Sequence, residues 1–424
     1  MKLLIFNPEH DIALAINKDR FTPPHAGRQL RADLGFLPSL WAEEGDMVLV
    51  DDVEAVAEAV RHLPKYAMTV KFVSLADLSK ADIASLADFE VDPWGWDSTI
   101  RRQLLDANPN LRPYLPTAER LDEMRRMSSR RFAAEHFLPQ LVSMDERLIG
   151  RSHYCEDLPS VVQAISENGK SVLKSPWSSS GRGVRYVDGT QLTDHQQGWV
   201  NNVLSLQGGI MVEPLYRKVM DFGMEFMAQK DGTVDFCGLS MFDTLNGAYT
   251  GSILATEDDK REMLSRYCEM ALLDKVCEKI KSLLSPLFAG NYHGPFGVDM
   301  MIVATDNAET FLIHPCVEMN LRRTMGHVAL AVSPSKMESQ GVMAISFSGK
   351  YHLRIHKTNA NTLKEVGVRR FLLLLFYFYL YFSIIALALS SPSSSAFFRH
   401  SMPSSFLLLI ARATPFIIRA SVFS

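Results

Sequence analysis

Short apolar runs alternate with helix-like stretches over the first hundred residues. The runs cover residues 3–6, 47–50 and 70–73, and a stretch with helical periodicity at 51–62 separates the last two. This alternation is typical of βα units arranged around a mostly parallel sheet. We therefore predict a small α/β domain at residues 1–112.

A different pattern begins after a proline- and asparagine-rich stretch at 108–117, which predicts a linker. Charged helices are expected at 118–137 and 258–287, and strand-like runs dominate the rest. These runs lie at 171–176, 183–187, 209–214, 222–228, 233–242, 298–304 and 310–320, followed by a closing hairpin at 343–357. The pattern predicts an α+β body with a large mixed sheet at residues 113–357.

Residues 358–424 have a different composition. Glu365 is the last of the chain's 48 acidic residues, and the rest is rich in serine, phenylalanine and leucine. That bias favours a low-complexity tail that is non-native or disordered. The uncharged segment 371–389 is also long enough to span a bilayer, and Arg369 and Arg370 would keep its start on the cytoplasmic side, so a membrane helix stays open.

Charge and cysteine content narrow the class of protein. The 44 basic and 48 acidic residues give a formal net charge of -4, so no global basic field points to nucleic acid. Five scattered cysteines without a C-x-x-C pair fit a reducing compartment. The first apolar run is too short for a secretory signal, and we expect a cytoplasmic protein.

The first chemical motif is a lysine followed by a small-residue loop. Lys174 ends a predicted strand, and the loop at 175–184 is rich in serine and glycine before the next strand begins. Small residues let backbone N–H groups wrap closely around phosphates. The order fits neither a Walker A loop nor a dinucleotide fingerprint, and an ordinary turn between strands is an equal alternative.

The second motif joins Asp299 to Glu318 and Asn320. If their segments pair as a hairpin, the three side chains converge, because positions two apart share one face of a strand. Hard oxygen ligands of this kind suit magnesium, which binds one or two carboxylates together with substrate phosphates. Cysteine and histidine spacings offer no comparable case for zinc.

The third motif is the strand at 211–214, which runs into a polar connection ending at Asp221. A strand exit of this type can serve as an adenine hinge, but the isolated pattern is weak.

Taken in order along residues 112–357, these motifs resemble the ATP-grasp superfamily. Members carry a basic residue on an early helix, a strand lysine with a glycine-rich flap, an acidic hinge, a metal-binding acid and an E-x-N-x-R motif. The counterparts here are Arg131, Lys174, Glu213, Asp299 and Glu318-x-Asn320-x-Arg322, with His327 beyond them as in biotin-carboxylase-like members. The resemblance implies a Rossmann-like N-terminal domain followed by an ATP-grasp fold of two α+β subdomains.

The resemblance also implies roles for individual residues. Arg131 and Lys174 would contact the phosphates, and Arg322 would stabilise the phosphoryl group in transfer. The flap over the triphosphate would comprise Ser178, Ser179, Ser180, Gly181 and Gly183. Adenine would lie against Glu213 and the Leu215 backbone, and ribose against Asp221. Asp299, Glu318 and Asn320 would hold Mg²⁺, with Mn²⁺ as an alternative. Pro214 and the Arg-Lys pair before Asp221 depart from the usual hinge and bear on base and ribose selectivity.

The implied activity is ATP-dependent ligation of a carboxylate to an amine, thiol or other nucleophile through an acyl phosphate. An ATP-binding regulatory module without ligase activity is the alternative. The expected partners are a small-molecule or peptide carboxylate and a nucleophilic acceptor, and a homodimer stays open. Candidate acceptor residues, each with an equally plain structural role, are Glu9, His10, Asp11, Arg28, Arg31, Trp94 and Trp96.

Overall fold

The computed structural model describes most of residues 1–358. The exceptions are residues 62, 64–66, 84–85, 87, 179–182, 246–247, 308–309 and 336–339. Met1–Val368 form one compact unit. The predicted tail and its candidate membrane segment at 371–389 lie outside the described residues. Within the described part of the chain, no helix has the length and apolar character needed to cross a membrane.

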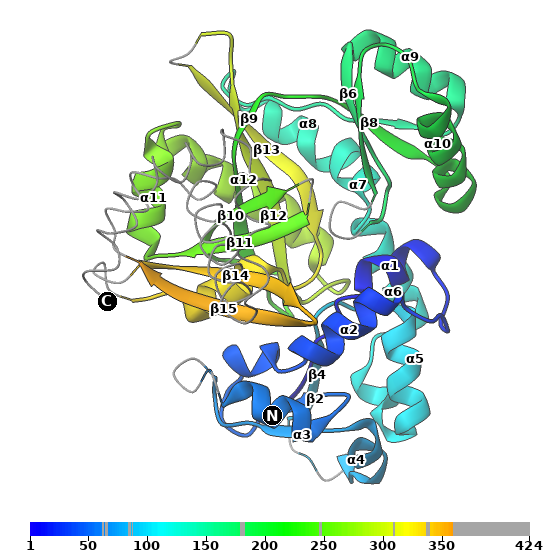
Figure 1. Ribbon diagram of the computed structural model, residues 1–424, viewed down its shortest axis with the longest axis vertical. Coiled ribbons are helices and arrows are strands. Elements are labelled where there is room, and N and C mark those ends of the chain that lie inside the picture. Colours follow the sequence, from blue (N-terminus) through cyan, green and yellow to red (C-terminus); the bar gives the residue numbers. More distant parts are fainter. Residues whose placement is uncertain are drawn as a thin grey trace, which may run out of the picture. The chain divides into compact units, whose positions relative to one another are not determined.

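The N-terminal part, blue to cyan in Figure 1, contains a parallel sheet. Its strand order is β3-β2-β1-β4. Its elements are β1 (Lys2–Ile5), α1 (His10–Ile16), α2 (His25–Leu34), η1 (Leu37–Leu40), β2 (Met47–Leu49), α3 (Val53–Val60), β3 (Lys71–Val73), α4 (Leu75–Lys80), β4 (Glu90–Pro93) and α5 (Ser98–Ala107). The central strand β1 has its last three residues fully buried, which explains its unbroken apolar run. The α/β character predicted for this part is confirmed.

The chain order reverses across β1, because β2 pairs with one edge of this strand and β4 with the other. The loops that follow β1 and β4 therefore meet at the carboxyl end of the sheet, where open α/β sheets commonly bind ligands. The stretch predicted as a linker is instead the 3₁₀ helix η3 (Pro109–Tyr114), whose Leu111 is fully buried in the N-terminal core.

The single helix predicted at 118–137 is broken into several pieces. They are α6 (Ala118–Met127), α7 (Arg130–Phe132), the π-helical turn η4 (Ala133–Phe137) and α8 (Leu138–Val142). Two serines cause the first break: Ser128 Oγ donates to the Met124 carbonyl, and Ser129 Oγ accepts from the N–H of Phe132 and caps a new helix. Serine side chains compete with the helical backbone in this way.

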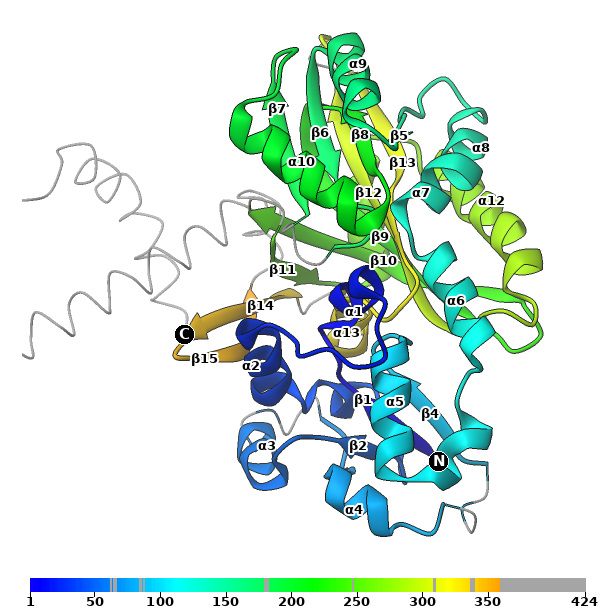
Figure 2. The same cartoon turned by 90° about the vertical axis from the view of Figure 1, so that its right-hand side faces the viewer.

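A small antiparallel sheet follows, with the order β5-β8-β6-β7. Its elements are β5 (His153–Cys155), α9 (Leu158–Asn168), β6 (Lys170–Lys174), β7 (Val184–Asp188), α10 (Asp194–Gln207) and β8 (Ile210–Pro214). Figure 2 shows α9 and α10 beside this sheet. Their apolar residues share one core cluster with Leu173 and Val212 of the strands.

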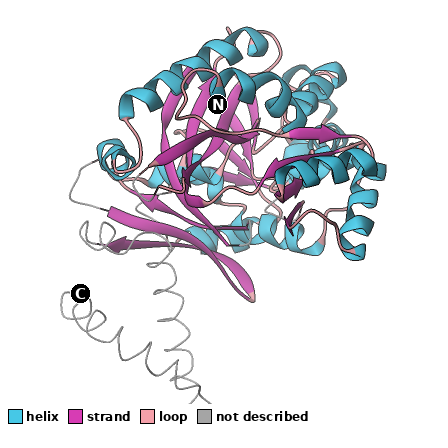
Figure 3. Ribbon diagram, turned by 90° about the horizontal axis from the view of Figure 1, so that it is seen from above, coloured by secondary structure: helices cyan, strands magenta, loops and turns pink. Residues whose placement is uncertain are grey.

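The large sheet has seven strands in the order β13-β12-β9-β10-β11-β14-β15. Its elements are β9 (Lys218–Ala228), β10 (Val234–Leu245), β11 (Ala248–Leu254), α11 (Glu257–Ser265), α12 (Met270–Phe288), β12 (Gly294–Ala304), β13 (Phe311–Asn320), α13 (Met325–Val332), β14 (Gln340–Ser348) and β15 (Lys350–Thr358). All its described pairings are antiparallel, so the expectation of a mixed sheet was wrong. Two helices replace the one expected at 258–287, and β11 was not predicted. Figure 3 shows these strands with the helices packed around them.

The N-terminal sheet and the large sheet share a hydrophobic core. Phe6 and Trp94 belong to the same cluster as Val328 of α13, Leu254 of β11 and Met343 of β14. The α2 helix also lies against β15 (Figure 2). This shared core fixes the loops after β1 and β4 against the residues that follow β13.

Candidate nucleotide and metal site

The three predicted metal ligands are brought together at one end of the β12–β13 pair. Asp299 lies opposite Glu318 in the register, and Gly297 lies opposite Asn320. The Asn320 Nδ2 donates to Asp299 Oδ2 at 3.0 Å. Asp299, Glu318 and Asn320 therefore form one cluster of oxygen-bearing side chains.

The electrostatics of this cluster favour a cation. Burial, followed by the nearby Glu318 and Glu225 carboxylates, raises the pKa of Asp299 well above its usual value. A divalent cation would relieve this crowding of negative charge. Among the described residues, no three His, Cys, Asp or Glu side chains form a metal cluster, so the candidate set is two carboxylates and one amide.

Arg322 connects this cluster to the N-terminal sheet. Its Nε and Nη2 donate to the two carboxylate oxygens of Asp11 at 2.9 and 2.8 Å, and Nη2 also donates to Asn320 Oδ1 at 3.0 Å. Burial opposes the charge of both partners, yet their mutual attraction prevails, so the pKa of Asp11 is lowered and that of Arg322 is raised. A chain of polar contacts thus runs from Asp11 through Arg322 and Asn320 to Asp299.

Arg130, rather than the predicted Arg131, reaches this site. Arg130 is buried, and its guanidinium lies 2.6 Å from Glu318 Oε1 and donates to the Ser175 carbonyl and to Ser178 Oγ. Arg131 is 45% exposed, pairs with Glu135 at 2.8 Å and lies over the Tyr154 ring. The helix break at Ser128 and Ser129 changes which of the two arginines faces the site, and the single helix predicted at 118–137 has no such break.

Lys174 and Glu213 form a second buried pair near the predicted hinge. Lys174 Nζ lies 2.6 Å from Glu213 Oε2, and Ser152 Oγ donates to the other oxygen of Glu213 at 3.1 Å. The N–H of Leu215 donates to the Lys170 carbonyl at 2.9 Å, so of the Leu215 backbone groups expected to face adenine, the N–H already has a partner.

The predicted ribose ligand lies farther along β9. Asp221 Oδ2 accepts from Lys218 Nζ and from Thr244 Oγ1. It is paired with Met301 in the register, two positions along β9 from the residue that faces Asp299. Asp221 therefore lies on the same face of the sheet as the metal cluster, in line with its predicted neighbourhood.

The flap is described only at its two ends. Ser178 and Gly183 meet closely: a Cβ on Gly183 would lie 2.3 Å from the Ser178 Cβ, so only glycine fits. The Ser175 N–H donates to the Gly183 carbonyl at 2.8 Å and closes the base of the loop. Ser179, Ser180 and Gly181 lie outside the described residues.

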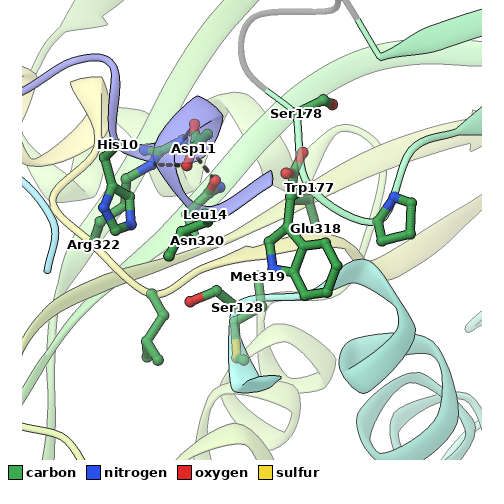
Figure 4. Close-up of a pocket in the computed structure, with 12 residues that line it drawn as sticks. His10, Asp11, Leu14, Ser128, Trp177, Ser178, Glu318, Met319, Asn320 and Arg322 are labelled. Atoms are coloured by element: carbon green, nitrogen blue, oxygen red, sulfur yellow. Dashed lines mark hydrogen bonds and ion pairs between the residues drawn. The ribbon is translucent and has the colours of Figure 1, made fainter. Parts of the chain in front are cut away.

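A pocket brings together α1, the flap base and the end of β13 (Figure 4). Figure 4 shows His10, Asp11 and Arg322 on one side and Trp177 and Ser178 on the other. The pocket is lined by His10, Asp11, Leu14, Ser128, Pro176, Trp177, Ser178, Glu318, Met319, Asn320, Leu321 and Arg322. The sequence singled out His10 and Asp11 only as acceptor candidates and missed their proximity to Arg322.

The other acceptor candidates have structural roles in this arrangement. Trp94 packs edge-on against Phe6 at 5.0 Å in the shared core, and Arg31 lies 3.0 Å from Glu9. Burial raises the pKa of Glu9 despite this arginine. Neither Arg28, Arg31, Trp94 nor Trp96 lines the pocket.

The histidines near the motifs differ in their surroundings. His327 is tied into a buried network, with Nδ1 3.0 Å from Glu225 Oε2 and Nε2 3.1 Å from the Phe226 carbonyl oxygen. His314 is 1% exposed, and neither of its ring nitrogens has a hydrogen-bond partner among the described residues. Burial, and secondarily the Lys174 charge, lowers the pKa of His314 to about 3.

Comparison with known proteins gives only remote similarity. No protein-family model and no curated protein matches the chain. Among solved structures it is similar to N5-carboxyaminoimidazole synthetase from Staphylococcus aureus complexed with ADP, at 11% identity and a TM-score of 0.46 over 82% of each chain.

Two other similar structures are a biotin carboxylase and an ATP-grasp candidate. The biotin carboxylase of Campylobacter jejuni is 12% identical, with a TM-score of 0.44 over 81% of this chain and 75% of that chain. A candidate ATP-grasp superfamily protein from Archaeoglobus fulgidus is 15% identical, with a TM-score of 0.38 over 85% of this chain and 100% of that chain. At this distance, the function of the chain depends on what its own residues can do.

Proposed function

We propose that this chain is a magnesium-dependent enzyme of the ATP-grasp type, which activates a carboxylate as an acyl phosphate for attack by an amine or another nucleophile. The observation that carries the proposal is the pocket at the end of β13. The pocket is lined by Glu318, Asn320 and the partly buried Arg322, and the buried Arg130 lies beside it in contact with Glu318.

Cationic side chains would bind the phosphates of ATP. Arg130 and Lys174 are buried and lie at the base of the flap, where a polyphosphate would replace their present carboxylate partners, Glu318 and Glu213. Arg130 takes the role that the resemblance gave to Arg131. Glu213 and Asp221 would orient the base and the ribose, with the Leu215 carbonyl rather than its N–H facing the purine.

The oxygen donors fit magnesium. Asp299 and Glu318 are adjacent across the strand pair, and burial, followed by the neighbouring carboxylates, raises the pKa of Asp299, so a divalent cation bound there would favour its ionised form. Asn320 would add its amide oxygen, which now accepts from Arg322. Bound there, Mg²⁺ would neutralise phosphate charge during phosphoryl transfer.

Arg322 would act at the reacting end of the pocket. A substrate carboxylate oxygen attacks the γ-phosphorus of ATP, the bond to the bridging oxygen breaks and ADP leaves with the electron pair. Arg322 is positioned by Asp11 and Asn320, and its fixed positive charge would stabilise the phosphoryl group as negative charge redistributes.

Thermal stability with nucleotide tests the binding half of this proposal. ATP with magnesium should raise the unfolding temperature of the full chain more than ATP with a chelator. The absence of a shift under both conditions would contradict nucleotide binding.

Release of ADP tests the catalytic half. A panel of carboxylates, each with and without an amine or a thiol, should reveal substrate-dependent ADP formation. Nucleotide binding without ADP release across the panel would favour an ATP-binding regulatory module instead.

A further inference from the structure

His10 is an imidazole held by a buried carboxylate. Its Nδ1 lies 3.1 Å from Asp97 Oδ2, and the two side chains are 2% and 3% exposed. Asp97 Oδ2 also accepts from Asn7 Nδ2 at 3.2 Å, while Oδ1 accepts from the Ile100 N–H at 2.8 Å and caps α5. A carboxylate that only accepts requires a proton on His10 Nδ1, which leaves a lone pair on Nε2.

The ring is fixed in place, and its Nε2 remains available. Gly95 lies against the ring, and a Cβ at that position would come within 2.6 Å of it. Among the described residues, the only hydrogen-bond partner of the His10 ring is Asp97. His10 lines the same pocket as Arg322, Glu318 and Asn320.

The ring lies beside the Asp97 carboxylate, and the next residue along α1, Asp11, forms an ion pair with Arg322 at 2.8 Å. The arrangement is that of an oriented general base, at the end of the pocket where the phosphoryl group would be transferred.

We propose that His10, oriented by Asp97 in the pocket it shares with Arg322, is the general base that deprotonates an amine acceptor. This inference rests on the proposed function, which supplies the acyl phosphate. The ammonium form of the acceptor first gives one proton to His10 Nε2. The resulting amine nitrogen attacks the carbonyl carbon and forms a C–N bond, the bond from carbon to the phosphate oxygen breaks, and phosphate leaves with the electron pair and takes up the second proton lost by nitrogen. The acceptor class is therefore ammonia or a primary amine.

The substitution His10→Asn separates this role from a structural one. The asparagine Nδ2 can donate to Asp97 much as His10 Nδ1 does, but no base remains at the position of Nε2. Asp97 is a positioning residue, and Asp97→Asn keeps a good helix cap for α5 while it disturbs the tautomer of His10.

The test compares two nucleophiles on the full chain. With ATP, magnesium and a carboxylate from the ADP-release panel, hydroxylamine is already unprotonated at neutral pH, whereas ammonium must lose a proton. We expect the ratio of ammonium- to hydroxylamine-supported product to fall about 100-fold in His10→Asn and less steeply in Asp97→Asn. The exposed His25 offers a matched control, His25→Asn, which should keep the wild-type ratio.

The outcomes separate the two proposals. No hydroxamate from the wild type with any carboxylate would overturn both the proposed function and the role of His10. Hydroxamate formation with an unchanged ratio in His10→Asn, or equal losses with both nucleophiles, would overturn the role of His10 alone. If magnesium and ATP do not stabilise His10→Asn, then His10→Gln replaces it in the same comparison.

Discussion

Replacing His314 with leucine should make the protein less sensitive to acid. His314 lies on β13, 1% exposed, with the Tyr216 ring 5.6 Å away and its ring nitrogens unpartnered among the described residues. Its pKa falls to about 3 in the folded protein because burial, and then Lys174, disfavour the imidazolium. The unfolded chain binds the same proton near the ordinary histidine pKa of about 6.5.

The sign and the magnitude follow from this difference in pKa. The stability that depends on a neutral His314 is fully present above about pH 6.5 and is lost as the pH falls toward the folded pKa of about 3. Each pKa unit corresponds to about 1.4 kcal/mol. Between pH 7 and pH 5, His314 should therefore remove about 2 kcal/mol from the free energy of unfolding.

Urea denaturation at pH 7 and pH 5 measures this effect. The wild type should lose about 2 kcal/mol more than His314→Leu over this interval. The change in packing caused by leucine is present at both pH values and cancels in the comparison. His195 is exposed, so His195→Gln should follow the wild type. An identical pH dependence in the wild type and in His314→Leu would refute the reasoning, because His314 would then be protonated in the folded state.

Four further predictions concern the site. Glu318→Gln should lower substrate-dependent ADP release about 100-fold while the circular dichroism spectrum stays native, and full turnover would exclude a metal role. Arg130→Ala should lower ADP release about as much, whereas Arg131→Ala, at the exposed neighbouring position, should keep ADP release within about threefold of wild type. A larger loss in Arg131→Ala than in Arg130→Ala would contradict the observation that Arg130 is the arginine that faces the site. Asp11→Asn should reduce the free energy of unfolding in urea by about 3 kcal/mol, because Arg322 loses its charged partner; an unchanged value would mean that the pair contributes nothing. A chain ending at residue 358 should keep the thermal shift with magnesium and ATP, since every described site residue lies before that point, and loss of folding would show that the remainder is structural.

The proximity of Asp299, Glu318 and Asn320 could be predicted because its geometry is local. Asp299, Glu318 and Asn320 lie on strands joined by a short connection, and the alternation of side chains along a strand places them on one face. The choice between Arg130 and Arg131 could not be predicted in the same way. It depends on a helix that stops and restarts at two serines, which shifts the phase of the residues that follow.

The sequence could not predict that residues after the N-terminal strands contribute to the site, and the reason is different. No periodicity relates Asp11, on α1, to Arg322, which follows β13. The hydrophobic core that the N-terminal sheet and the large sheet share brings these two residues together. The same holds for His10 and Asp97, which meet because the strand order reverses across β1. The sequence analysis also did not predict β11, and it predicted one helix at 258–287 where the structure has α11 and α12.

The contact between Asp11 and Arg322 also bears on how the molecule acquires its activity during folding. These residues are separated by 311 positions, so their pairing closes most of the described chain into a loop. Contacts of such high sequence separation carry a large entropic cost and form slowly. During synthesis, α1, which carries Asp11, emerges long before Arg322, the residue with which Asp11 pairs. We therefore expect the contact between Asp11 and Arg322 to form late in folding, and a partly synthesised chain to contain α1 without the arginine that Asp11 binds.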